Sequence, residues 1–292
     1  MGGLPVLVLC GFWGAAVAEV AGRVRAEHPG VRVMVAPEGA EPDQLRTAEA
    51  PHIVTVVPAD LLLDGLADER PVSQLVARQL EQADTVLLTG QPEGDDEWEA
   101  EQLRVLVQRI APWARQAGVD DLIPYAPGRT TPVAAVTRGL RGRPVGVHHP
   151  VGDHGVVACV FQARRPFHPG RLHESLPELT DGVLRSRGTC WRADRPDVVM
   201  TWESAGTLRL RPWGRWLAAD PGDSDPERSL AAAVDWHPYY DDRGQHLAFI
   251  GLDLDPVRLH RTLTRCLLTD PELADGWDSW SDLLLATKEK PQ

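Results

Sequence analysis

VLVLCGFWGAAVAE, residues 6–19, decides the fold of the first half of the chain. An apolar run ends at Gly11, and Gly14 follows three residues later at the start of a helical pattern. A strand that turns directly into a helix is the outline of a phosphate-binding loop. A working loop reads G-x-x-x-x-G-K-[ST], because the lysine contacts the β- and γ-phosphates and the hydroxyl contacts Mg²⁺. The last three positions of this pattern are instead Ala16, Val17 and Ala18. The sequence therefore has the strand–turn–helix outline of a phosphate-binding loop but lacks the residues that contact phosphate and Mg²⁺.

Length and composition predict a cytoplasmic protein of two domains. The 292 residues suffice for two hydrophobic cores, and 43% hydrophobic with 25% charged residues is typical of soluble globular proteins. The apolar start lacks a basic region and runs into Glu19, Arg23 and Arg25, which favours a first strand and helix over an export signal. We expect no membrane partner, because no run approaches the ~18 apolar residues of a spanning helix. The cysteines are scattered without a CxxC pair, which favours buried, reduced thiols.

The charge of the chain limits its partners. A net charge of −12 argues against non-specific nucleic-acid binding, and we expect no direct sequence-specific nucleic-acid partner. Arginines between residues 129 and 143 form a local basic run, which is either a binding patch or a solvated connector. The only lysines are Lys288 and Lys290, so no lysine in the first 287 residues is present to hold a phosphate.

Residues 1–140 alternate short apolar runs with helical patterns. This order predicts βαβ units and a mostly parallel sheet, and runs that are apolar throughout favour a sheet covered on both faces. The expected strands are residues 4–10, 31–37, 52–58, 84–90 and 120–126. The expected helices are residues 15–27, 71–82, 95–113 and 131–140. We therefore predict an α/β domain of the P-loop type.

The pattern changes after residues 141–155, a stretch rich in proline and glycine that we interpret as a linker. The following domain, residues 156–285, predicts an α+β fold with clustered antiparallel strands. Its expected strands are residues 156–163, 183–193, 197–205, 207–218 and 246–254. Its expected helices begin at His168-Pro169, at residue 226 and at Asp255-Pro256.

Several phrases of the second domain carry a family resemblance. They include RRPFHPGRL (164–172), WESAG (202–206), LRLRPWGRWLAA (208–219) and RCLLTD (265–270). Taken in order over about 120 residues, they resemble the C-terminal domain of the CobW-like GTPases. Residues 233–255 resemble the actinobacterial branch of that family most. This branch includes a mycobacterial factor that recruits a hibernation-promoting protein to ribosomes under zinc limitation.

The first domain departs from this family at each functional motif. The family loop reads roughly G-F-L-G-A-G-K-T, so Gly11 and Gly14 match as a vestigial phosphate loop while the lysine and threonine are lost. The segment that would carry the family's zinc-binding cysteine motif is absent between residues 37 and 52. The guanine-reading [NT]-K-x-D motif is replaced by Thr89-Gly90-Gln91-Pro92.

These losses predict a pseudo-GTPase, a GTPase fold without the activity. Each charge-assisted contact is worth about 1.5–3 kcal/mol. Several such losses would remove micromolar binding, which amounts to about 8 kcal/mol. We expect no catalytic residue and no nucleotide cofactor.

The linker offers a candidate metal site. His148, His149 and His154 lie within HHPVGDH, and neutral imidazoles are good Zn²⁺ ligands. Histidine-rich runs often occupy this place in CobW-like zinc chaperones. The alternative is a polar linker without metal, because a tract this short is only a compositional signal. We expect no cofactor, with Zn²⁺ as the alternative.

The second domain offers a candidate partner surface. Arg164, Arg165 and His168 precede a helix and suit an anionic partner, although His168 as a helix cap and paired arginines is the alternative. Trp213 and Arg215 place an aromatic ring beside a cation at a turn, although a core tryptophan is the alternative.

The resemblance implies a non-catalytic protein that recruits a protein partner, such as a ribosome-associated hibernation factor, in a zinc-responsive setting. Two alternatives stay open. One is a GTP-independent zinc metallochaperone that uses the histidine linker. The other is a GTPase homologue that retains weak nucleotide binding. The oligomeric state is not predicted.

Overall fold

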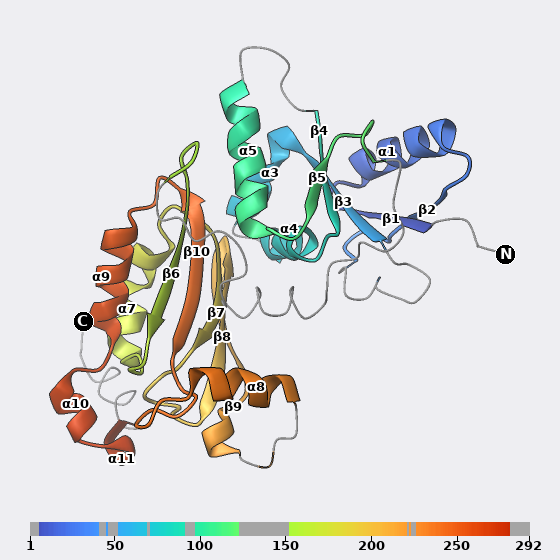
Figure 1. The fold of residues 1–292 in the computed structure, drawn as a ribbon. Helices are drawn as coiled ribbons and strands as arrows, with labels where there is room; N and C mark the ends of the chain where they lie inside the picture. The colour runs from blue at the N-terminus through green and yellow to red at the C-terminus, as the bar shows by residue number, and fades with distance from the viewer. Residues whose placement is uncertain are drawn as a thin grey trace.

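The computed structural model contains two five-stranded sheets (Figure 1). It describes residues 6–40, 45, 52–68, 71–90, 97–122, 152–220, 222 and 226–280. We call described residues 6–122 the parallel-sheet unit and residues 152–280 the antiparallel-sheet unit. No helix within these ranges is long and apolar enough to cross a membrane.

The first sheet is entirely parallel, with strand order β2-β1-β3-β4-β5. Its strands are β1 Val6–Cys10, β2 Arg32–Val35, β3 His52–Pro58, β4 Thr85–Thr89 and β5 Arg115–Ala117. Its helical segments are α1 Gly14–Glu27, η1 Ala59–Leu61, α3 Leu62–Ala67, α4 Pro71–Glu81 and α5 Glu97–Ile110. One core packs α1 on the sheet and another packs α3, α4 and α5, so the predicted α/β architecture is confirmed.

Two sequence predictions fail in this sheet. The fifth strand is Arg115–Ala117, and of the predicted 120–126 run the described residues 120–122 form a turn. Leu122 is buried from this turn, so its apolar character marks core packing rather than a strand. The edge strand β2 is also not covered on both faces, because Met34 and Val35 are 43% and 44% exposed.

The second sheet is antiparallel, with strand order β6-β10-β7-β8-β9. Its strands are β6 Val156–Ala163, β7 Val183–Cys190, β8 Val198–Ala205, β9 Thr207–Arg215 and β10 Gln245–Leu252. Its helical segments are α7 Pro169–Thr180, η2 Leu217–Ala219, α8 Pro226–Asp235, α9 Pro256–Cys266, α10 Asp270–Ala274 and α11 Trp277–Trp280. Helices α7 and α9 cover one face of the sheet, and this core contains the buried Trp202. The predicted α+β pattern is confirmed.

The two units share one apolar core and a close backbone contact. The cluster beneath α3, α4 and α5 also contains Val156, Ala205 and Ile250 of the second sheet. Gly206, in the turn from β8 to β9, has φ of +65°, and a Cβ there would lie 1.9 Å from the carbonyl oxygen of Asp68. Only glycine fits so close an approach. The antiparallel sheet therefore packs directly against the parallel-sheet unit.

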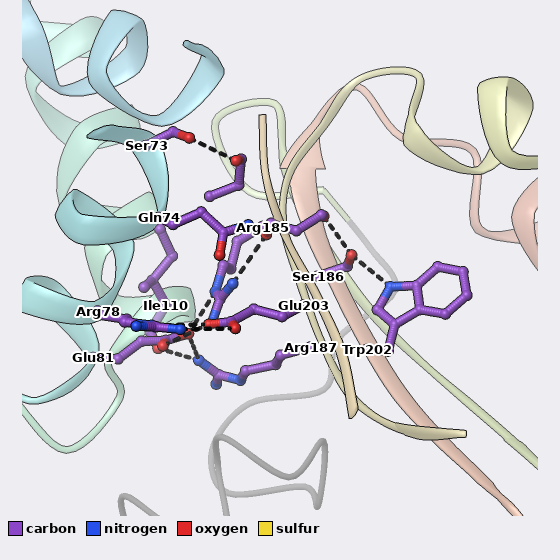
Figure 2. A network of polar contacts seen from close by, with 12 residues as sticks. Ser73, Gln74, Arg78, Glu81, Ile110, Arg185, Ser186, Arg187, Trp202 and Glu203 are labelled. Atoms are coloured by element: carbon purple, nitrogen blue, oxygen red, sulfur yellow. Dashed lines mark hydrogen bonds and ion pairs between the residues drawn. The ribbon is translucent and has the colours of Figure 1, made fainter. Parts of the chain in front are cut away.

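A buried ionic network crosses the same contact (Figure 2). Glu81 at the end of α4 is fully buried, and its two carboxylate oxygens accept hydrogen bonds of 2.7 and 2.9 Å from Arg185 of β7. Arg187, also on β7, donates to the same carboxylate and to the carbonyl of Ile110. Arg78 and Arg185 both bond Glu203. Burial opposes ionisation of Glu203, yet these arginines lower its pKa, so it is a carboxylate in the network.

Candidate functional site

The turn between β1 and α1 keeps the outline of a phosphate loop. Close packing, without any phosphate, is enough to explain why its first glycine, Gly11, is needed. A Cβ at Gly11 would lie 2.5 Å from the carbonyl oxygen of Val56 on β3. Gly14, the first residue of α1, is exposed with open space around it. Gly11 is therefore required by the close approach of two strands, whether or not a phosphate binds.

The space beyond the ends of β1 and β3 is occupied by aromatic side chains. In open α/β sheets this edge, where the strand order reverses, is the usual ligand crevice. Trp13 precedes α1, and two of its ring atoms lie 2.8 and 2.9 Å from where a Cβ at Gly65 of α3 would be. Phe12 packs edge-to-face on Trp13 with ring centroids 5.4 Å apart, and both rings pack on the shared core. The turn is thus held by packing against α3, a helix that the sequence analysis missed.

The position that would hold the phosphate-loop lysine points into the protein. Val17 is 3% exposed and packs with Leu9 and Val54 in the core beneath α1. Ala18, at the position of the Mg²⁺-binding hydroxyl, is exposed. The first turn of α1, residues 14–17, carries no basic residue, and its N-cap makes no side-chain hydrogen bond. This end of α1 offers backbone N–H groups but no side chain that could neutralise a triphosphate.

Of the predicted metal ligands, only His154 lies among the described residues; His148 and His149 are outside them. The Nδ1 of His154 lies 2.9 Å from Asp153, and its ring lies 6.0 Å from that of Trp98 on α5. Its backbone carbonyl accepts a 2.7 Å hydrogen bond from Gln102 of α5. The described part of the chain contains no group of three or more His, Cys, Asp or Glu residues placed to hold a metal. The zinc site therefore stays a prediction.

The predicted partner residues at the start of α7 have structural roles. His168 is the N-cap of α7, with Nδ1 accepting hydrogen bonds from the N–H groups of Gly170 and Arg171. Burial, followed by the charge of Arg171, lowers the pKa of His168 and keeps this acceptor neutral. Arg165 pairs with Asp270, and Arg164 donates to the carbonyl of Arg243 at 3.4 Å. These contacts agree with the alternative reading, in which His168 caps the helix and the arginines are paired. A role of these residues in partner binding stays a prediction.

Trp213 and Arg215 lie on β9, the edge strand opposite β6. Pairing with β8 shifts register beside Trp213, whose side chain is 42% exposed. Arg215 pairs with Asp197 at 3.3 Å. Asp197 also pairs with the guanidinium of Arg243, and the backbone carbonyl of Arg243 accepts a hydrogen bond from Arg164. The two predicted patches are therefore joined through a chain of polar contacts, although they come from opposite edges of the sheet.

The sequence analysis missed the buried network of Glu81, Arg185 and Arg187. A usable signal was present, because Arg185 and Arg187 are two residues apart in the expected strand and therefore face the same side of it. Two arginines on one face of a sheet imply a carboxylate partner when another part of the protein covers that face.

The chain is similar in sequence to several known proteins. Residues 156–267 match the model of the cobalamin synthesis protein cobW C-terminal domain. The zinc chaperone Rv0106 of Mycobacterium tuberculosis and the uncharacterized protein Mb0109 of Mycobacterium bovis are each 37% identical over 277 residues, which is 86% of this chain. The chain spans 65% of the length of these mycobacterial relatives. These similarities support the CobW-like family that the resemblance predicted.

Two further similarities are more limited. Zinc-regulated GTPase metalloprotein activator 1 of Dictyostelium discoideum is 33% identical over 135 residues, covering 44% of this chain and 28% of its own length. The crystal structure of the Zn(II)-bound YjiA GTPase from E. coli superimposes with a TM-score of 0.37 at 14% identity, over 92% of this chain and all of that one. Structural likeness of this size supports no conclusion about function.

Proposed function

We propose that this CobW-like protein acts without GTP hydrolysis, as a pseudo-GTPase that recruits a protein partner. The observation that carries the proposal is Val17, buried to 3% exposure where a phosphate loop places its lysine. A lysine there would have to enter an apolar core, and the chain has no other lysine before Lys288. Transition-state stabilisation in this enzyme class depends on that cation and on Mg²⁺. Trp13 packed against Gly65 adds a second obstacle at the ligand crevice.

The partner class is proposed from the family. The resemblance to the actinobacterial branch points to a ribosome-associated hibernation factor, and the absence of the cysteine motif between residues 37 and 52 suits a protein that acts when zinc is scarce.

Calorimetric titration with GTP and ATP in the presence of Mg²⁺ tests the pseudo-GTPase proposal. We expect no saturable binding below about 100 μM, because the loop has lost contacts worth about 1.5–3 kcal/mol each. Saturable binding in this range, or phosphate release above a no-protein blank, would refute the proposal. A pull-down from zinc-starved cells of the source organism should recover ribosomal or hibernation proteins, and their absence refutes the recruitment role.

A GTP-independent zinc chaperone is the second candidate. It is favoured by the 37% identity to the zinc chaperone Rv0106 of Mycobacterium tuberculosis. In this reading His148, His149 and His154 bind Zn²⁺ through neutral imidazoles. Equilibrium dialysis with Zn²⁺ should then show uptake by the natural chain and none by the triple alanine variant of these histidines. Equal, negligible uptake by both rejects the candidate.

A further inference from the structure

An exposed tryptophan lies at the start of α5, beside the turn that leads into β6 (Figure 1). The side chain of Trp98 is 55% exposed, and its ring lies 6.0 Å from that of His154 in this turn. Gln102, one helical turn further along α5, donates a 2.7 Å hydrogen bond to the carbonyl of His154. The helix therefore holds the indole against the turn while about half of the ring surface faces solvent.

Carboxylates surround this indole. The Oδ1 atom of Asp253, directly after β10, and the Cη2 atom of Trp98 both lie within 4 Å of the point that a Cβ at Gly155 would occupy. Glu101 is three residues from Trp98 on α5, so the two side chains are neighbours on the helix surface. We call this cluster the Trp98 surface, and its members are Trp98, Glu101, Asp153, His154 and Asp253.

The negative charge of the Trp98 surface is only weakly compensated. Residues 93–101 contain six acidic residues and no basic one. Glu101 pairs with Arg104 at 3.1 Å, but both side chains are largely in solvent, where an ion pair contributes little. Asp253 is exposed, and within the described ranges it forms no ion pair. The surface therefore attracts cations.

An organic cation suits this surface better than a metal ion. No group of three or more His, Cys, Asp or Glu residues in the described ranges is placed to hold a metal. An exposed indole attracts a cation to the face of its ring, and nearby carboxylates add to this attraction. Arginine is favoured over lysine, because its planar guanidinium stacks on aromatic rings and pairs with a carboxylate through two hydrogen bonds.

We propose that the Trp98 surface binds an arginine side chain from a basic segment of a protein partner. The guanidinium stacks on the exposed part of the Trp98 ring and pairs with Asp253, while Glu101 attracts neighbouring cations of the same segment. The proposal rests on the proposed recruitment function, because it names the chemistry of the recruited partner. The surface also differs from the one predicted from sequence, which suits an anion and comprises Arg164, Arg165, His168, Trp213 and Arg215.

Fluorescence anisotropy with a labelled Arg-Gly-Arg-Gly-Arg-Gly-Arg peptide tests the proposal on the full chain at low ionic strength. We expect saturable binding with a Kd below about 1 mM. A probe with citrulline in place of arginine keeps the shape without the charge and should not bind. A lysine probe should bind more weakly than the arginine probe, because an ammonium group does not stack on the indole. Absence of saturable binding, or equal binding of the arginine and citrulline probes, would overturn the proposal.

Substitutions of Trp98 locate the site without changing the charge of the chain. Trp98→Leu should weaken binding of the arginine probe about three- to fivefold, the scale of one exposed cation–π contact. Trp98→Phe keeps an aromatic face and should recover part of this loss. Trp236→Leu is the matched control, because Trp236 is 53% exposed and lies outside the Trp98 surface. It should leave binding unchanged.

Substitution of Asp253 tests the carboxylate. Asp253→Asn should weaken binding about threefold, the scale of one exposed ion pair. Asparagine tolerates the φ of +51° at this position, so the turn is kept. Asp220→Asn, at an exposed residue after η2, removes the same charge elsewhere and should have less effect. Equal melting temperatures of variants and controls show that folding is unchanged.

Three results would overturn the site. Equal affinities for Trp98→Leu and Trp236→Leu would mean that net charge alone holds the probe. Equal affinities for Asp253→Asn and Asp220→Asn would remove the carboxylate from the site. Self-association in sedimentation equilibrium that the probe competes away would make a second copy of the chain the occupant. Nucleotide titration and the pull-down report on the proposed function separately, so each proposal can fail without the other.

Discussion

At the scale of single residues, Glu272 shows how a carboxylate fixes the C-terminal end of the described chain. It follows the N-cap Thr269 in a capping box at the start of α10. Both its oxygens accept hydrogen bonds from Arg171 of α7, at 2.7 and 2.8 Å. Hydrogen bonding from Arg171, followed by bonds from Thr269, lowers the pKa of Glu272 to about 2. The pair ties α10 to α7 between residues 101 positions apart in the sequence.

This pKa predicts a stability change in acid. A carboxylate whose pKa is depressed by folding adds stability that is complete above its unfolded pKa and is lost as pH falls through the folded value. For Glu272 the window runs from 4.5 down to about 2. The full shift corresponds to about 3 kcal/mol at neutral pH, and solvent screening of this partly exposed pair reduces the contribution to about 1–2 kcal/mol. Urea unfolding should therefore show a smaller difference between the natural chain and Glu272→Gln at pH 3 than at pH 6. A difference that is constant across this range would contradict the assigned pKa.

The residues that sequence reasoning placed correctly are those whose roles depend on near neighbours. Asp255 caps α9, accepting from the N–H groups of Val257 and Arg258, and His168 caps α7 in the same way. Capping involves only the next three residues, so it is visible in sequence. The pairing of Arg171 with Glu272 joins residues 101 positions apart, and no local pattern encodes it.

At the scale of elements, regular patterns predicted well and irregular ones did not. β3 was predicted at residues 52–58 and β6 at 156–163, both as observed, because each is a continuous apolar run. α3 was missed because LLDGLA is too short to show a helical period. Because α3 was missed, the contact between Gly65 and Trp13, which fills the candidate site, could not be predicted. The limit on predicting the site was therefore tertiary contact between two short segments.

The packing of α1 on the sheet leads to a prediction. We expect that substitutions at residues 17 and 18 cannot restore the lost phosphate-binding chemistry. Val17→Lys would bury an unpaired ammonium among Leu9, Val20 and Val54. We expect a loss of about 3–5 kcal/mol in the free energy of unfolding, the usual cost of an uncompensated buried charge. The matched control is Ala18→Lys, one position along on the exposed side of α1, which should change stability by less than about 0.5 kcal/mol.

Guanidinium unfolding of both lysine variants measures this difference, and GTP titration of Val17→Lys with Ala18→Thr completes the test. We expect the double variant to be destabilised and still not to bind GTP. A double variant with the stability of the natural chain and saturable GTP binding would show that the turn retains a working phosphate cradle.

At the scale of the whole molecule, the two units are joined by a contact that couples charge to packing. Ser73 donates to the carbonyl of Ala205 at 2.6 Å, and Gln74 donates to that of Thr207 at 3.0 Å. Around Glu81, Arg187 also lies over the ring of Trp113 at 5.7 Å. The elements joined by these contacts also contribute residues to one apolar core. We therefore expect the units to unfold together.

Glu81→Gln tests this coupling, because the fully buried Glu81 carboxylate neutralises Arg185 and Arg187, which are also buried. Removing its charge leaves buried Arg187 without this carboxylate and leaves Arg185 with Glu203 as its remaining ion-pair partner. Breaking a buried pair in this way costs about 3–5 kcal/mol. The control is Glu101→Gln, which removes an exposed pair with Arg104 on α5 and should cost less than about 1 kcal/mol. Calorimetry should show one transition for the natural chain and the control, and two for Glu81→Gln, since the parallel-sheet unit loses its charged tie to the antiparallel sheet. A single transition shifted no further than that of Glu101→Gln would mean that apolar packing alone joins the units.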